Sequence, residues 1–284
     1  MAVDLAGRIL GPIIGLVVVG LLFAPLERKW PLVRRRLLRP GWRTDVAHFL
    51  FTGVLAGAAG VAGIVAAWLL VGWWAPASLH AAVGGQPVAL QLVQVFILGN
   101  LIGYWAHRLS HEVPFLWRFH KVHHSSTHLD WLAAARRHPL EEAWNGLLVG
   151  VPLIFLGFQV QQVAALQAIQ VIYAIFLHAN VRWRLPGLRH VIATPEFHHW
   201  HHSDDPEHYN TNYSLFPWLD ALFGTRYQPD HRARTFGVPG YEAGGYLRQM
   251  KEPFRRRPKA TSAPPAPAAT TTTSLSWDEF LRRR

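Results

Sequence analysis

The chain has 284 residues, of which 50% are hydrophobic and only 16% charged, and its mean hydropathy is +0.11. Lysine and arginine nevertheless outnumber aspartate and glutamate by 28 to 17, and this apolar but basic composition favours a membrane protein over a nucleic-acid binder. The absence of cysteine excludes disulfides, iron–sulfur clusters, thiolate metal sites and a cysteine nucleophile.

Three apolar stretches are long enough to cross a bilayer, which takes about 20 residues. They cover residues 9–26, 46–74 and 88–105. The second contains glycines at small-residue spacing, which either lets a neighbouring helix approach closely or is merely tolerated in an apolar helix. These glycines are Gly53, Gly57, Gly60 and Gly63.

Two more apolar segments, residues 147–158 and 163–181, predict a helical hairpin. The first of them is short and the second contains several glutamines, so the pair either spans the membrane or enters and returns. The sequence thus predicts an all-α, multi-span helical bundle.

The basic loops predict how the bundle is oriented. The loop after residue 26 carries seven Lys or Arg residues by position 43, whereas residues 75–87 carry none. The positive-inside rule places the first loop in the cytoplasm. Counting the crossings then brings His107 and His178 to the cytoplasmic face, where we expect a helical cap.

Composition divides the chain into three parts. Residues 1–87 are predicted to form a transmembrane region of two spans with a basic loop, and residues 88–257 the domain in which we expect the functional site, because most of the histidines lie there. Residues 258–284 form a tail, whose Ala/Pro/Thr-rich stretch at 258–276 is predicted to be disordered. Its last residues, 277–284, predict either a short amphipathic helix at the bilayer surface or a tail without contacts.

Histidine is concentrated in two segments, because 14 of the 17 lie at residues 107–138 or 178–208. On a helix, residues at i, i+3 and i+4 share a face. A HxxxH box therefore aims two imidazoles one way, and each HxxHH box aims three. The boxes are His107-Arg-Leu-Ser-His111, His120-Lys-Val-His123-His124 and His198-His199-Trp200-His201-His202.

Eight converging imidazoles are more than one tetrahedral zinc uses and are enough for two metal ions. Imidazole suits Fe, Zn and Cu. The isolated His128, His138, His190 and His208 are predicted to be surface residues or to support the ligands.

The boxes and their surroundings resemble the fatty acid hydroxylase / sterol desaturase family from about residue 95 to residue 227. The other matching motifs are Ser125-Ser126, Arg137-His138-Pro139-Leu140-Glu141, Phe176-Leu177-His178-Ala179-Asn180, Thr194-Pro195-Glu196-Phe197 before the last box, Asn212-Tyr213, Asp220 and Phe223-Gly224-Thr225. Two positions depart from the family pattern, namely Ser214 and Pro217-Trp218.

The resemblance implies a set of metal ligands and supporting residues. The implied ligands are His107, His111, His120, His123, His124, His178, His198, His201 and His202. His199 stands at a variable position of its box and is expected to point away. Asn212, Tyr213 and Asp220 are expected to orient the imidazoles. No catalytic residue beyond the metal centre is predicted.

The same resemblance implies an integral membrane oxidoreductase with two non-haem iron ions and O2 as co-substrate. Such an enzyme hydroxylates or desaturates a lipid C–H bond, in a fatty acyl, sterol, hopanoid or carotenoid-like molecule. The chain shows no nucleotide-binding motif and no haem-binding segment, so we expect an external ferredoxin- or cytochrome-type electron donor. No nucleic-acid partner is expected.

Two other classes remain as alternatives. A membrane zinc hydrolase would carry HExxH, but Pro114 and Phe115 follow His111-Glu112 and the second histidine is missing. A non-catalytic metal-binding or transport protein would carry acidic or histidine residues at bilayer depth, and the first three spans have almost none.

Overall fold

The structure is a computed structural model of the chain, and it describes residues 2–205 and 208–255. The described residues contain no β-strand, only two isolated bridges, Pro31 with Val181 and Ser203 with Phe236. The predicted all-α class is therefore confirmed. The predicted disordered stretch at 258–276 and the predicted terminal helix at 277–284 lie outside the described residues.

The helices follow one another with short connections. Their bounds are α1 Ala2–Lys29, α2 Trp42–Ala47, a π-helical turn His48–Thr52, α3 Gly53–Val71, α4 Ala77–Gly84, α5 Val88–Glu112, α6 Pro114–His124, a 3-10 turn Ala133–Ala135, α7 Pro139–Phe155, α8 Val160–His178, α9 Pro195–His201, α10 Pro217–Leu222, α11 Tyr246–Lys251 and a 3-10 turn Glu252–Phe254.

Four helical segments of the described chain are long and apolar enough to cross a membrane. They are Leu10–Lys29, Trp42–Val71, Val88–Glu112 and Val160–His178. The predicted hairpin forms as α7 and α8, but only α8 meets this criterion. The third helix also runs past the predicted end at residue 105, because the histidine-bearing segment up to Glu112 continues the same helix.

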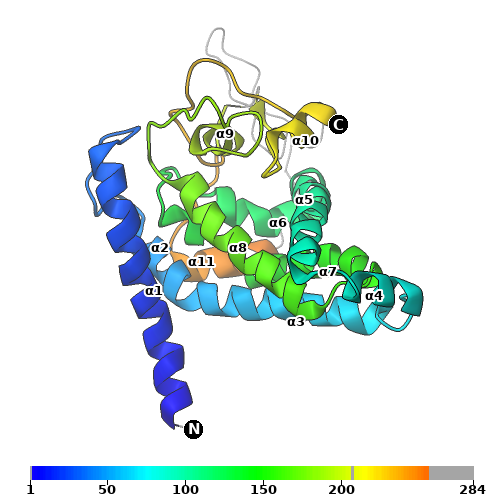
Figure 1. Cartoon of the computed structure of the whole chain (residues 1–284). Coiled ribbons are helices and arrows are strands. Elements are labelled where there is room, and N and C mark those ends of the chain that lie inside the picture. The colour runs from blue at the N-terminus through cyan, green and yellow to red at the C-terminus, as the bar shows by residue number, and fades with distance from the viewer. Residues whose placement is uncertain (1, 206–207, 256–284) are drawn as a thin grey trace, which may run out of the picture.

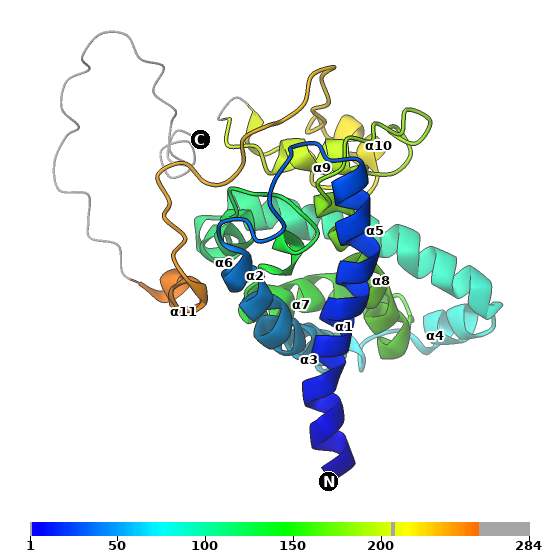
Figure 2. The ribbon, with the colours of Figure 1, turned by 90° about the vertical axis from the view of Figure 1, so that its left-hand side faces the viewer.

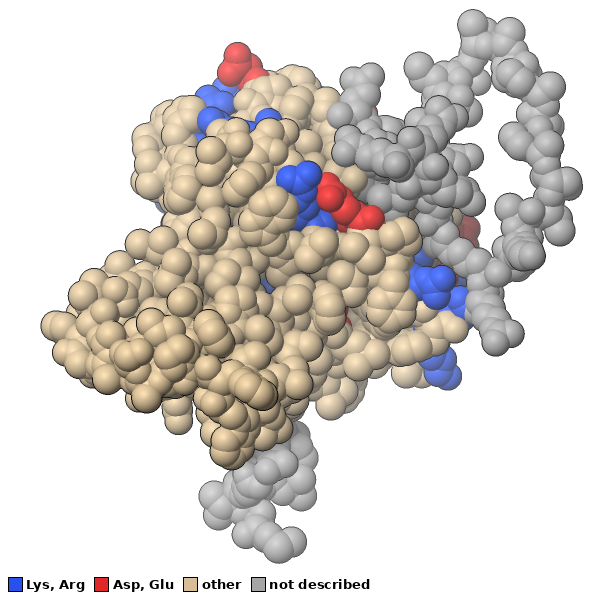
Figure 3. Space-filling model, turned by 90° about the vertical axis from the view of Figure 1, so that its right-hand side faces the viewer, with Lys and Arg blue, Asp and Glu red and all other residues tan. Residues whose placement is uncertain are grey.

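The helices of the bundle present apolar side chains outward. Leu21, Leu70, Val88 and Ile172 are each at least 60% exposed, as are Trp73 and Trp74 in the turn after α3. Figure 3 shows a broad lower region of one face without Lys, Arg, Asp or Glu. Such a surface suits lipid rather than water. The placement of the histidine-bearing end of the molecule on the cytoplasmic side of the membrane stays a prediction.

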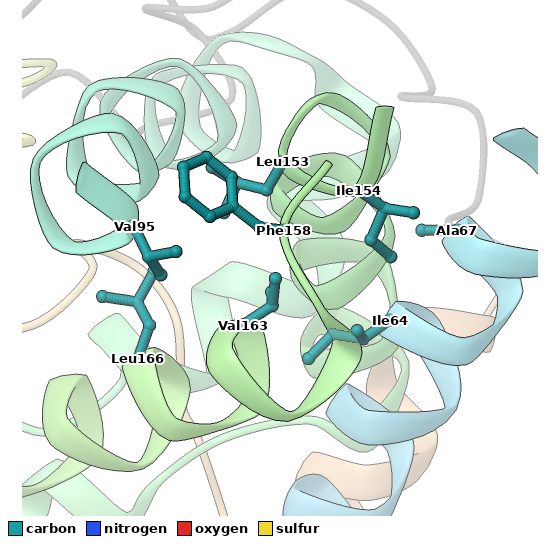
Figure 4. Packing of buried hydrophobic residues seen from close by; sticks show 8 residues of the cluster. All are labelled: Ile64, Ala67, Val95, Leu153, Ile154, Phe158, Val163 and Leu166. Atoms are coloured by element: carbon teal, nitrogen blue, oxygen red, sulfur yellow. The ribbon is translucent and has the colours of Figure 1, made fainter. Parts of the chain in front are cut away.

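Helices α9 and α10 lie together at one end of the molecule, above the ends of α5 and α8 (Figures 1 and 2), and we call this end the cap. The N-terminal end of α1 points in the opposite direction. The bundle itself is joined near the N-terminal ends of α5 and α8 by a cluster of buried aliphatic and aromatic side chains from α3, α5, α7, α8 and the α7–α8 loop (Figure 4). This packing holds α5 and α8 so that their C-terminal ends meet under the cap.

Helices α3 and α7 pack backbone against backbone through glycine. A methyl group added to Gly63 would collide with the carbonyl of Ala143, and one added to Gly146 would collide with the carbonyl of Gly60. Gly60 and Gly63 therefore serve the close approach that their spacing predicts. Gly57, in contrast, has nothing within 4 Å of an added methyl group.

We expect Gly63→Leu to lower the free energy of unfolding by about 3 kcal/mol or more, because the new side chain forces the two backbones apart. The measurement is denaturation of the purified protein in detergent. Gly57→Leu is the matched control and is expected to unfold like the parent. Equal losses in both variants would contradict the close α3–α7 contact.

Candidate metal centre

The nine predicted ligand histidines converge under the cap in two adjoining groups. Within each group the donor nitrogens all lie within 4.8 Å of one another. The five-histidine group consists of His107, His111, His120, His124 and His201, and the four-histidine group consists of His123, His178, His198 and His202. The stacked rings of His124 and His202, with centroids 4.2 Å apart, join the two groups.

Helices end or begin at three places in the chain, and these boundaries bring the imidazoles together. Extended Val113 ends α5, and Pro114 starts α6 at a position where its missing N–H costs nothing. Thr194 begins α9 by accepting a hydrogen bond from the Phe197 N–H. His178 is the last residue of α8, so the C-terminal ends of α5, α6 and α8 meet the short helix α9 at one place.

Each HxxHH box is divided between the two groups, which refines the expectation that its three imidazoles aim one way. In α6, His120 and His124 join the five-histidine group while His123 joins the other. In the last box, His198 and His202 join the four-histidine group while His201 crosses over. Adjacent residues on a helix point about 100° apart, so neighbouring histidines fall on opposite sides of the boundary. Helices α6 and α9 thus exchange one ligand each.

Hydrogen bonds to carbonyl oxygens fix how four of the imidazoles present their nitrogens. In each case the imidazole Nδ1 bonds to a backbone carbonyl oxygen. The pairs are His107 with the carbonyl of Tyr213 at 2.7 Å, His123 with that of Arg136 at 3.0 Å, His178 with that of Ala174 at 2.7 Å and His201 with that of Thr211 at 2.8 Å. A carbonyl oxygen only accepts, so each Nδ1 carries the hydrogen and each Nε2 of the neutral ring has a free lone pair.

These lone pairs fit a bound cation. The Nδ1 of His120 donates to the Glu141 carboxylate, so in the neutral ring the Nε2 of His120 carries a lone pair, which faces the Nε2 of His107 at 3.2 Å. Two facing lone pairs repel unless a cation lies between them. Two ligands at about 2.1 Å from one ion, about 90–110° apart, are separated by about 3.0–3.4 Å. The buried Nε2 of His201 has no hydrogen-bond partner among the described residues.

Burial keeps the imidazoles of the cap in the form that binds metal. Loss of hydration, together with neighbouring histidines, lowers the pKa of His123, His124, His198, His201 and His202 well below the ordinary value. At neutral pH these rings are uncharged, and a neutral imidazole is the ligand that metal ions take.

The predicted supporting residues lie around this centre. The Asp220 carboxylate accepts hydrogen bonds from the backbone N–H groups of Tyr213 and Ser214, at 2.8 and 2.9 Å, and so holds the carbonyl that orients His107. Burial raises the pKa of Asp220 to about 6. The Asn212 amide bonds to the carbonyls of Phe197 and Tyr227. Asn212 therefore ties α9 to the loop after α10.

Glu141 is a site residue to which the sequence analysis gave no role. Its carboxylate bonds to the His120 imidazole. Burial alone would raise the pKa of Glu141, but His120 and Arg137 lower it, so the group is an anion. A carboxylate on the far nitrogen of a ligand orients the ring and raises its basicity. The signal was available, because Glu141 lies within the quoted Arg137–Glu141 motif.

The sequence also did not predict a network of buried ion pairs that supports the histidines. Arg39 bonds to Asp45 and to Asp130, each at 2.6 Å, and Asp45 bonds in turn to Arg136. The carbonyl of Arg136 is the one that orients His123. The basic loop after α1 therefore supports the ligand shell, although the sequence pointed only to its role in orientation.

Five further histidines have partners away from the two groups. His199 faces the carbonyl of Ala179, with its Nε2 at 3.1 Å. His138 caps α7 by accepting from the Leu140 N–H, and His190 bonds to Arg226. His128 bonds to Thr127, and His208 lies 3.6 Å from Asp205.

Comparison with known proteins gives this region a family. Residues 92–225 match the model of the fatty acid hydroxylase family, described as fatty acid hydroxylase. This segment belongs to that family. The fatty acid hydroxylase segment contains all nine converging histidines together with Asn212, Tyr213 and Asp220, and the resemblance inferred from the sequence is thereby confirmed.

Three curated relatives illustrate what the chain is similar to. The chain is 35% identical over 174 residues to the ornithine lipid hydroxylase OlsE of Rhizobium tropici, and the alignment covers 60% of this chain and 52% of that protein. It is 30% identical over 137 residues to the alkylglycerol monooxygenase of Danio rerio, covering 48% of this chain and 30% of that protein. The human fatty acid hydroxylase domain-containing protein 2 is 28% identical over 137 residues, covering 48% of this chain and 38% of that protein.

The chain thus spans about half the length of the first of these relatives and less of the other two. No solved structure matches the chain.

A comparison of His178 with His199 distinguishes a metal ligand from a nearby histidine that does not bind metal. We expect His178→Ala to lose bound metal, because its Nε2 faces that of His198 at 3.4 Å inside the four-histidine group. His199→Ala should keep the metal, because its ring turns to Ala179 instead. Metal per chain, measured by mass spectrometry on the purified variants, tests this, and the reverse ranking would contradict the four-histidine group.

We expect Glu141→Gln to lower metal affinity by about 10- to 100-fold, because the amide removes the charge that holds His120. The measurement is metal retained during titration with a chelator. Glu112→Gln, which removes a carboxylate paired with Arg108 at 3.0 Å, is the control and should retain metal like the parent. Unchanged retention in Glu141→Gln would show that the carboxylate has no part in the ligand shell.

Proposed function

We propose that this chain is a membrane-bound, O2-dependent, non-haem di-iron oxidoreductase that hydroxylates or desaturates a lipid C–H bond. The observation that carries the proposal is the convergence of Nε2 lone pairs in two adjoining histidine groups inside a fatty acid hydroxylase segment. The names of the relatives, an ornithine lipid hydroxylase and an alkylglycerol monooxygenase, support a lipid substrate.

The five-histidine and four-histidine groups would each hold one iron ion. Bound iron would supply the activation of O2, with two electrons from outside the chain. The residues of this chain have a simpler task, which is to hold neutral rings in fixed positions. Backbone carbonyls and Glu141 do so from outside the ligand shell, and burial keeps bulk water away.

A cavity of about 210 Å³ lies between α5, α7 and α8 and opens onto both histidine groups. His107 and His120 border it from one group, and His123, His178 and His198 from the other. Apolar side chains such as Val149 and Leu166 line the part of the cavity away from the histidines. Such a lining would hold the hydrocarbon of a lipid next to the metal centre.

The remaining parts of the proposal concern surroundings and domain limits. Residues 88–257 would act as the catalytic domain, whose helical cap faces the cytoplasm, and residues 1–87 as its membrane anchor. An external ferredoxin- or cytochrome-type donor would deliver electrons from the cytoplasmic side. The basic loop after α1 supports this orientation through the positive-inside rule.

The alternative functions are a membrane zinc hydrolase and a non-catalytic metal-binding or transport protein. A hydrolase of the HExxH type uses the glutamate as a general base beside the metal. Glu112 instead pairs with Arg108, which disfavours that use. Both alternatives predict binding without consumption of O2.

The test is lipid product formed in membranes containing the protein, with O2 and a chemical or enzymatic reductant. We expect two irons per chain and an oxidised lipid, and no product from His120→Ala or His124→Ala, because each loses a ligand. His190→Ala, whose ring bonds to Arg226, is the control and should keep activity. Zinc in place of iron, with no O2-dependent product, would contradict the proposal.

A further inference from the structure

A second hollow lies between α1, α3 and α8, three helices that each contain a candidate membrane span. We call it the α1–α3–α8 groove, and its volume is about 460 Å³. Pro12 of α1, Val54 and Gly57 of α3, and Ala168 and Ile175 of α8 belong to its lining. Figure 1 shows α8 passing in front of α3 with α1 beside them.

Small residues keep this groove open toward the lipid. Gly53 and Gly57 on α3 are exposed, as is Ala168 on α8. A methyl group at Gly57 would meet nothing within 4 Å. These positions differ from Gly60 and Gly63, whose lack of a side chain is required by close neighbours. Helix packing does not explain the glycine at position 57.

The inner end of the groove is polar and adjoins the histidine cavity. Arg137, Glu142, Gln167 and Val171 line both hollows. Arg137 donates to Glu142 at 2.9 Å, and the Gln167 amide packs against Gly60. An apolar passage between membrane helices therefore ends at hydrogen-bonding groups beside the proposed metal centre.

We propose that the α1–α3–α8 groove binds an acyl chain of an intact polar lipid taken directly from the bilayer, and that Gln167 and Arg137 hydrogen-bond the ester or amide linkage that joins chain to headgroup. The inference rests on the proposed function and names its substrate class. An acyl chain in this groove stays in apolar surroundings throughout its entry. Only the linkage then needs donors, and Arg137 has five N–H groups, of which Glu142 engages one.

The test is photocrosslinking in proteoliposomes containing the full, metal-loaded chain. The probe is phosphatidylethanolamine with a diazirine on one acyl chain, and adducts are located by peptide mass spectrometry. We expect adducts on residues 53–61 of α3 and 164–175 of α8. Excess unlabelled phospholipid should suppress them, whereas palmitoyl-coenzyme A, an acyl group carried through water, should not.

Two substitutions that fill the groove from opposite sides, one on α3 and one on α8, keep the test independent of the folding of either variant. Gly57→Phe and Ala168→Phe should each reduce these adducts by about tenfold, equivalent to about 1.4 kcal/mol of binding, with metal content unchanged. Ala58→Phe and Ala165→Phe are the controls, because these neighbouring exposed positions lie outside the groove lining. They should label like the parent.

The polar end is tested by Gln167→Leu, which removes the amide at similar volume. We expect weaker labelling by the phospholipid, by about 2- to 10-fold for one hydrogen bond. Labelling by a diazirine-bearing alkane, which has no linkage, should not change. Equal labelling of plugged and control variants, adducts outside the groove, or competition by the thioester alone would overturn the proposal. Because crosslinking needs no turnover, its outcome is separate from that of the proposed oxidation.

Discussion

The repulsion among nitrogen lone pairs that face one another in a buried space is the constraint on which the rest of this structure depends. Carbonyl oxygens that only accept hydrogen bonds force hydrogen onto the outer nitrogens of His107, His123, His178 and His201. The inner nitrogens are therefore bare and point at each other. A charged ring would be costly at this burial, so bound cations are the natural partner of the arrangement.

Such a centre needs a frame that does not yield, and the frame comes from three directions. The aliphatic cluster of α3, α5, α7 and α8 holds the C-terminal ends of α5 and α8 together from below. Asp220 holds the loop that orients His107, and the Arg39–Asp45–Arg136 charges hold the loop that orients His123. The exchange of His123 and His201 between the two groups couples them, so that α6 and α9 each support both.

The sequence predicts those features that depend on local periodicity. Apolar runs gave the helices of the bundle, and HxxxH and HxxHH spacing gave the imidazoles that converge. The division of His120, His123 and His124 between two groups depends instead on how α6 is rotated against α9, which tertiary packing decides. The groups that orient the ligands were harder to predict, because backbone carbonyls such as that of Arg136 give no signal in a residue pattern. Glu141 carried a readable signal, a carboxylate in a motif already quoted. Which face of the membrane bears the cap still rests on the charge of the loops.

The central claim is that two adjoining histidine groups each hold one metal ion. The most direct measurement is a structure of the iron-loaded protein with anomalous diffraction at the iron edge, together with iron per chain by mass spectrometry. The account predicts two anomalous peaks, one surrounded by the five-histidine group and the other by the four-histidine group, and two irons per chain. A single peak, or a peak outside these nine imidazoles, would contradict it.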